Sequence, residues 1–363
     1  MKTKCKDGSS ISGSTQRGFV RTHLSIQAFL PALGETLESE LDENHRLFLE
    51  VCIQTRIEND GARYGWQGTG RPPASRRKIL KAFVAKALWN HADTRTLHRE
   101  LCTDPVLRRL CGWDFAGEIP SESTFSRAFA QFAADDLLSA VVARISTAVC
   151  GATESDHVCY DSTAIDAREK PAFKAPRAQP GLSRIPAQSA RSADLNIADL
   201  PRQCDFGCKK NSKGKTDFWR GYKLHAATIC GDIPICAFVS SASLHDSQAI
   251  IPLMQQASQR FRHRYDLADA GYDSRLVREF SRLCGRTPVI QFNNRFPALR
   301  PRRFTTEEKR IYKKRTAIER FFSHLHERHG GRTIRVRGAA KIQTHLLFGT
   351  LVILIEQFLH TLR

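Results

Sequence analysis

The spacing of apolar residues divides the chain into two parts. From about residue 24 to residue 150, apolar residues recur at intervals of three and four, as at Leu80, Phe83 and Val84. This period is that of an amphipathic helix, and it predicts an all-α domain over residues 24–150. Residues 1–23 are rich in Ser, Gly, Thr and Lys, with few apolar residues to bury. We expect them to form a flexible N-terminal tail.

After residue 150 the pattern becomes that of a sheet with helices between its strands. Short apolar runs bounded by turn residues predict five strands, at 157–164, 218–230, 233–243, 264–269 and 287–293. Helices are predicted from near Asp246, over about 274–284, and through a long segment around Tyr312. This is the element order of the ribonuclease H-like fold. We therefore expect an α/β domain over residues 151–363 with a mixed five-stranded sheet and flanking helices.

The chain is strongly basic. It carries 56 Lys and Arg residues against 37 Asp and Glu residues, a formal net charge of +19. Such an excess favours a polyanionic partner, because contacts to phosphate release bound counterions. Residues 168–216, between the first two predicted strands, are also basic and show little periodicity. We interpret them as a solvated basic insertion, with DNA contact as the alternative.

The cysteines and the C-terminal apolar run exclude two classes of protein. The 11 cysteines are odd in number and scattered, without a preceding signal segment, so we expect a reducing cytoplasm and no disulfide framework. Cys204 and Cys208 lack the paired spacing of a structural zinc site. The run Leu346 to Ile355 is shorter than the roughly 18 residues of a membrane span. It predicts a buried helix and no membrane partner.

A row of polar residues lies on one face of the predicted helix around Tyr312. Tyr312, Arg315 and Glu319 are spaced i, i+3 and i+7. With His326 they fall within a sector of roughly 60° on a helix that turns about 100° per residue. An apolar stripe lies beside them, formed by Ile311, Ile318, Phe322 and Leu325. The carboxylate of Glu319 is therefore expected at the edge of a buried face.

Two aspartates give Glu319 possible partners. Asp161 lies in the first predicted strand and Asp269 at the end of the fourth, and these strands are neighbours in the ribonuclease H-like order. Carboxylates are the hard oxygen ligands that Mg²⁺ prefers, and Mg²⁺ supports phosphodiester chemistry. We predict that Asp161, Asp269 and Glu319 are catalytic residues and metal ligands. Four competing acids have structural interpretations as strand ends, caps or turn residues: Asp166, Asp246, Asp266 and Asp273.

These motifs resemble those of the DDE transposases of bacterial insertion sequences. The resemblance covers most of the chain and rests on Asp161-Ser162-Thr163, Ala268-Asp269-Ala270-Gly271-Tyr272-Asp273 and Tyr-x2-Arg-x3-Glu over residues 312–319. It implies a ribonuclease H-like catalytic domain in which Asp161, Asp269 and Glu319 hold two Mg²⁺ ions, with Mn²⁺ able to substitute.

The resemblance also implies the substrate and the assembly. Members bind double-stranded DNA at the terminal inverted repeats of the element, cleave a strand and transfer the freed 3′-hydroxyl to target DNA, within a synaptic homodimer. Tyr312 and Arg315 are expected to support phosphate binding, with positioning of Glu319 as the alternative. The position of a family lysine is His326 here, with Arg328 as the nearest cation. We predict phosphate contacts for both, and the other interpretation of His326 is a hydrogen-bonded polar residue.

The all-α part offers one candidate recognition helix. Pro120 to Arg127 combines capping residues with a basic side chain, as helix-turn-helix units do, although many packed helices share these features. The resemblance implies DNA binding by this part and a cytoplasmic, nucleoid-associated protein. Two other functions remain open: a ribonuclease H-like nuclease without strand transfer, and an inactive DNA-binding relic.

Overall fold

The computed structural model describes residues 41–172, 184–210, 214–293 and 303–362, together with the backbone of 3–4 and 10–11. Most of the predicted tail, and residues 24–40 of the predicted helical part, lie outside the described residues. Within the tail, β1 (Thr3–Lys4) pairs antiparallel with β2 (Ser10–Ile11).

The first half of the described chain is helical, as its apolar spacing predicts. The elements are α4 (Glu43–Thr55), α5 (Ile57–Asp60), η2 (Gly61–Tyr64), α6 (Arg76–Leu88), α7 (Thr94–Thr103), α8 (Pro105–Cys111), η3 (Ala116–Glu118), α9 (Glu122–Ala134) and α10 (Leu137–Ala152). Short-range signals in the sequence start and stop them. The side chain of Asp93 accepts the backbone N–H of Thr96 at the start of α7. Asp104 caps α8 ahead of Pro105, and Gly112 ends that helix with φ 103°.

The second half contains the expected sheet. Its strands are β3 (His157–Asp166), β4 (Asp205–Lys210), β5 (Thr216–Thr228), β6 (Pro234–Ser241), β7 (Tyr265–Ala268) and β8 (Thr287–Ile290). The order across the sheet is β6-β5-β3-β7-β8, with β5 antiparallel to β3 and β6 and with β7 parallel to β3 and β8. The predicted ribonuclease H-like α/β fold, with its first and fourth strands side by side, is confirmed.

The insertion between the first two predicted strands, which we interpreted as solvated, contains regular secondary structure. It contains α11 (Ile185–Gln188), α12 (Ala193–Ala198) and the strand β4, which pairs with β5. The sheet therefore has six strands rather than five. Residues 173–183 and 211–213 of the insertion lie outside the described residues.

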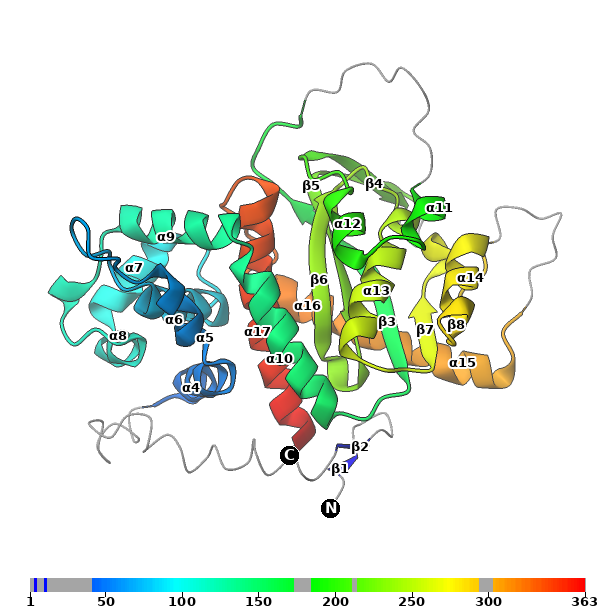
Figure 1. Ribbon diagram of the computed structural model, residues 1–363, viewed down its shortest axis with the longest axis horizontal. Helices are drawn as coiled ribbons and strands as arrows, with labels where there is room; N and C mark the ends of the chain where they lie inside the picture. The colour runs from blue at the N-terminus through cyan, green and yellow to red at the C-terminus, as the bar shows by residue number, and fades with distance from the viewer. Residues whose placement is uncertain are drawn as a thin grey trace.

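Helices cover both faces of the sheet (Figure 1). η5 (Asp246–Gln248), α13 (Ile250–Arg260) and α14 (Arg275–Leu283) match the helices predicted after the third and fourth strands. The segment predicted as one long helix consists of α15 (Thr306–Tyr312), η7 (Lys313–Arg315) and α16 (Thr316–Arg328). The three elements follow one another as a continuous right-handed helix, because the residues that flank η7 have right-handed helical dihedrals. In Figure 1, α13 lies in front of the sheet and α16 behind it.

The C-terminal helix joins the two halves of the molecule. α17 (Ala339–Leu362) lies between the helical region and the sheet in Figure 1 and contacts α6, α9, α10 and β6. The rings of Phe348 and Phe83 lie 5.7 Å apart. At Gly349 a Cβ atom would lie 2.5 Å from the His329 carbonyl oxygen, so glycine permits the close approach to α16. By length and composition α17 could cross a membrane, but 83% of its most apolar window is buried inside the protein, as in a core helix.

Candidate active site

Strand pairing brings Asp161 and Asp269 together. β3 and β7 run parallel, and their last paired residues are Cys159 and Leu267. Asp161 and Asp269 each follow two positions later, so alternation places them on the same side of neighbouring strands. The Asp269 carboxylate begins η6 (Ala270–Tyr272) and accepts the backbone N–H of Gly271 at 2.8 Å.

Asp161 is a largely buried carboxylate that the neighbouring Asp269 carboxylate repels. Burial and the nearby Asp269 raise the pKa of Asp161 to about 6, although the Ser162 amide, Arg315 and Lys209 act in the opposite direction. Its Oδ1 accepts the Ser162 backbone N–H at 2.8 Å, and its Oδ2 accepts Nη1 of Arg315 at 3.0 Å. Two acids that repel each other in a poorly solvated position have the charge of a cation site.

Arg315 connects Glu319 to this pair. Its Nη2 donates to Oε1 of Glu319 while its Nη1 holds Asp161. The pKa of Arg315 is raised overall by Asp161 and other neighbouring groups, against the opposing effect of burial. The Glu319 side chain is 53% exposed at the start of α16. In the described part of the chain, no three acidic, histidine or cysteine side chains gather closely enough to hold one ion. Glu319 is thus bound to the arginine rather than grouped with the aspartates.

Tyr312 lies beside the arginine. Its hydroxyl donates to Oε1 of Gln291 at 3.0 Å, and the Arg315 guanidinium carbon lies 5.7 Å from its ring centre. Burial raises the pKa of the Tyr312 phenol, with the effect of Arg315 opposing it. The predicted row Tyr312, Arg315 and Glu319 therefore stands together in the fold.

His326 and Arg328 have different surroundings. His326 Nε2 lies 3.0 Å from the Thr163 hydroxyl, on the same strand as Asp161. Burial lowers the pKa of His326, so the ring is neutral at physiological pH and does not supply the charge of a lysine. Arg328 is exposed at the end of α16.

Three of the four competing acids have structural partners, and the fourth is exposed. Asp273 accepts the Arg278 guanidinium and the backbone N–H of Asn293. Asp246 accepts Nζ of Lys223 at 2.8 Å and the Ser162 hydroxyl at 2.9 Å. Asp166 is exposed at the end of β3.

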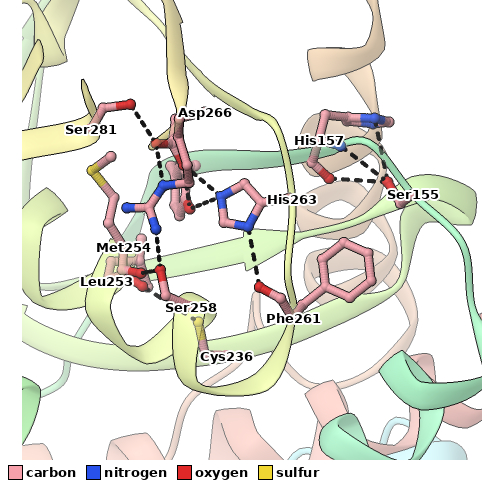
Figure 2. Close-up of polar contacts among 12 residues, drawn as sticks. Ser155, His157, Cys236, Leu253, Met254, Ser258, Phe261, His263, Asp266 and Ser281 are labelled. Carbon is pink, nitrogen blue, oxygen red and sulfur yellow. Dashed lines mark hydrogen bonds and ion pairs between the residues drawn. The ribbon is translucent and has the colours of Figure 1, made fainter. Parts of the chain in front are cut away.

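Asp266 is the centre of a buried polar network between β3, β7 and α14. Its carboxylate accepts Tyr160 Oη at 2.9 Å, Ser281 Oγ at 2.6 Å, His263 Nε2 at 2.7 Å and Arg286 Nε at 2.8 Å. Figure 2 shows Ser281 and His263 converging on the aspartate, with Ser155 and His157 in a separate contact nearby. Tyr160 lies in β3 directly before Asp161, and Asp266 lies in β7, three residues before Asp269. The network therefore fixes β3 and β7, the strands that position Asp161 and Asp269.

Sequence reasoning did not identify the contacts behind the acid pair. Lys223 and Asp246 form a largely buried ion pair that reaches Ser162, the neighbour of Asp161. A lysine within the apolar run of β5 was the available signal, since a buried lysine needs a partner. His225 packs against Phe238, and its Nε2 lies 2.8 Å from the Ser240 hydroxyl.

The cysteines have no metal-binding arrangement among the described residues. Cys204 is buried and Cys208 is exposed, and the cysteines of the described ranges form no disulfide. The zinc interpretation of this pair has no support in the described parts of the fold.

Comparison with known families agrees with this geometry. Residues 152–355 match the family described as Transposase DDE domain, and residues 35–131 match the Transposase domain (DUF772). No curated protein and no solved structure gives a significant match. The first family covers the sheet, the two aspartates and α16, and it extends over more than half of the chain. The chain belongs to the DDE transposase family.

Proposed function

We propose that the chain is the transposase of a bacterial insertion sequence, which binds the terminal inverted repeats of its element and catalyses Mg²⁺-dependent strand cleavage and strand transfer. The observation that carries this proposal is the arrangement of Asp161 beside Asp269, with Arg315 joining Asp161 to Glu319. Family membership supplies the substrate class, and the net charge of +19 suits a DNA partner.

The acid pair fits a hard divalent cation. Ionising both aspartates leaves negative charge in a poorly solvated position, as the raised pKa of Asp161 indicates, and a bound cation relieves this repulsion. Asp161, Asp269 and Glu319 would hold two Mg²⁺ ions, with Mn²⁺ as a substitute. When bound, the ions supply an activated oxygen nucleophile and a stabilised leaving oxygen. For Glu319 to join the aspartates, its contact with Arg315 has to open.

The remaining residues of the row bind and orient DNA in this proposal. The planar fork of Arg315 suits a phosphate as well as a carboxylate. Once its contact with Glu319 opens, the Arg315 guanidinium is positioned to bind a phosphate of the DNA backbone. Tyr312 keeps its ring beside Arg315 and its hydroxyl on Gln291. Arg328 contributes an exposed cation at the far end of α16. His326 supports β3 through Thr163 and offers phosphate a weaker donor than lysine.

The chemistry consists of two displacements at phosphorus. A water oxygen bonds to phosphorus at the end of the element, and the bond to the 3′-oxygen breaks to leave a 3′-hydroxyl. That hydroxyl then bonds to a phosphorus of the target and displaces a target 3′-oxygen. A homodimer that holds two element ends would join both to one target. We propose that the protein acts in the cytoplasm, at the nucleoid.

Cleavage and joining assays test the proposal. The protein is incubated with labelled DNA from the ends that flank its gene, with target DNA and Mg²⁺, and the products are resolved on denaturing gels. The wild type should nick the ends and join them to the target, and EDTA should abolish both products. Asp269→Ala should do neither. Asp166→Ala, which removes an exposed aspartate of the same sheet, is the matched control and should remain active.

The products distinguish the alternatives. Nicked DNA without joined product favours a nuclease without strand transfer. DNA binding without either product favours an inactive relic. Equal activity of wild type and Asp269→Ala would falsify the assignment of the site.

A further inference from the structure

The inserted strand β4 and the first part of β5 form a ribbon that extends past the main sheet. β3 pairs with β5 as far as Asp166 opposite Gly221, and β6 pairs from Ser241 opposite Tyr222. Among the described residues, 216–219 of β5 therefore pair with β4 alone, and the carbonyl oxygen of Arg220 also accepts the backbone N–H of Ala167. Figure 1 shows the β4 and β5 labels at one end of the sheet.

The ribbon is held in a defined shape. The Trp219 ring lies over Gly207 so closely that a Cβ atom on this glycine would be 2.3 Å from the ring. Nε1 of Trp219 donates to the Tyr222 carbonyl oxygen at 2.9 Å, and Nζ of Lys223 lies 5.8 Å from the ring centre. One face of the ribbon is therefore closed by packing.

The opposite face presents aromatic and basic side chains to solvent. Phe206 pairs with Arg220, and Cys208 pairs with Phe218, so these four side chains share one face and the two phenylalanines are diagonal neighbours. Phe206 is 61% exposed and Phe218 is 75% exposed. Arg220 is exposed as well. Two exposed phenylalanines on a shaped ribbon are typical of a binding surface rather than of a packing element.

This face continues the face of the sheet that carries Asp161. Asp161 pairs with Ala226, and alternation along β5 places Arg220 and Phe218 on the same side as Ala226. A DNA strand on the catalytic face can therefore extend to the two phenylalanines.

We propose that Phe206 and Phe218 stack on unpaired bases of the DNA beside the cleavage site, while Arg220 binds the adjoining phosphate. This inference rests on the proposed function and adds a preference for locally unpaired DNA. Bases in a duplex cover each other's faces, whereas unpaired bases expose a surface on which aromatic side chains stack. A second copy of the chain is a poorer occupant, because a symmetric contact would bring Arg220 towards the same arginine of the partner.

DNA-binding measurements with the full chain test the proposal. The probes are a labelled duplex of arbitrary sequence and the same duplex with a single-stranded oligothymidine tail. We expect the wild type to prefer the tailed probe. Phe206→Ala with Phe218→Ala should lower affinity for the tailed probe by about tenfold or more and leave duplex affinity within about twofold. Leu283→Ala is the control, because Leu283 is an exposed apolar residue on α14, 83% accessible.

A conservative variant separates stacking from folding. Phe218→Trp should keep the preference for the tailed probe, and its added fluorescence should be quenched by that probe but not by the duplex. The inference is overturned if the double alanine variant retains the wild-type preference, or if it changes only the oligomeric state in light scattering. If the wild type binds neither probe, the proposed function fails as well, whereas duplex binding and cleavage without a preference for the tail overturn the ribbon proposal alone.

Discussion

Arg315 has a central position among the charged residues of the site. Its guanidinium contacts carboxylates that come from a strand and from a helix. The same contact keeps Glu319 away from the aspartates. Arg315 therefore organises the site while it binds Glu319. In the function proposed here, it can bind phosphate once that contact opens.

Arg315→Lys should reduce strand cleavage by about 10- to 100-fold. A lysine ammonium lacks the planar fork with which Arg315 binds Asp161 and Glu319 together, and losing a hydrogen bond between charged groups has an effect of this size. Cleavage at saturating Mg²⁺ measures the effect. Arg320→Lys is the matched control, since Arg320 lies in α16 and makes a two-pronged pair with Asp232, away from Asp161. Similar losses in both variants would contradict a special role for Arg315.

Asp161→Asn should stabilise the metal-free protein at neutral pH. Asp161 has a pKa of about 6 in the folded chain, against about 3.9 when unfolded. The folded state binds this proton more tightly, so the wild type loses up to about 3 kcal/mol as pH rises from about 4 to above 6. Asparagine does not titrate and avoids the loss. Thermal unfolding in EDTA should give diverging midpoints as pH rises, and parallel curves would refute the prediction. Asp166→Asn should follow the wild type.

His326→Lys should raise DNA affinity and cleavage if position 326 contacts the backbone. Burial lowers the pKa of His326, so the native ring is uncharged and lysine adds a cation that the site lacks there. Affinity measured over a range of salt concentrations should show a steeper dependence for the variant, by about one phosphate contact. Unchanged affinity and cleavage would remove position 326 from the DNA interface and leave it as a partner of Thr163.

The strands that carry the aspartates depend on the network around Asp266. Burial alone would raise the pKa of Asp266, but contacts with His263, Arg286 and Ser281 lower it overall. A lowered pKa means that the carboxylate stabilises the fold above its unfolded pKa, and that this contribution disappears as pH falls. The network therefore stabilises the pairing of β3 and β7 at neutral pH.

Asp266→Ala should destabilise the protein by about 3–5 kcal/mol, because it leaves the cation Arg286 buried without its partner. Urea unfolding at neutral pH measures the change, and the difference from wild type should shrink in acid. Asp166→Ala provides an exposed aspartate in the same sheet as the control. A loss well below about 1 kcal/mol, the range of exposed pairs, would show that the network is not needed.

The elements that sequence could predict are those with local causes. The strands and helices around the aspartates follow from the apolar period along the chain. β4 was missed because Asp205–Lys210 is polar and its pairing with β5 is a long-range contact. The turn of 3-10 helix at Lys313–Arg315 leaves the apolar spacing unchanged and has no distinct signal. The bridge from Arg315 to Asp161 depends on packing between residues far apart in sequence.

The two halves of the molecule share one hydrophobic core through α17. The sequence predicted a buried helix over its apolar run, but not its partners, because a helix that is apolar all round indicates no particular neighbour. In the fold, α17 contacts the helical region through α6 and α9 and the sheet through β6. The helical region, which we expect to bind terminal repeats, and the sheet that carries Asp161 are therefore mechanically connected.

Phe348→Ala should lower the stability of both halves together, by about 3–5 kcal/mol for a buried phenylalanine. Phe348 contacts Phe83 and Phe129 of the helical region within the helix that also packs on β6. Hydrogen exchange followed by mass spectrometry should show faster exchange in α6 and in β6 to a similar degree. Leu359→Ala, near the end of the same helix and only partly buried, should have a smaller effect. Loss of protection in α6 with β6 unchanged would mean that the helical region unfolds as a separate unit.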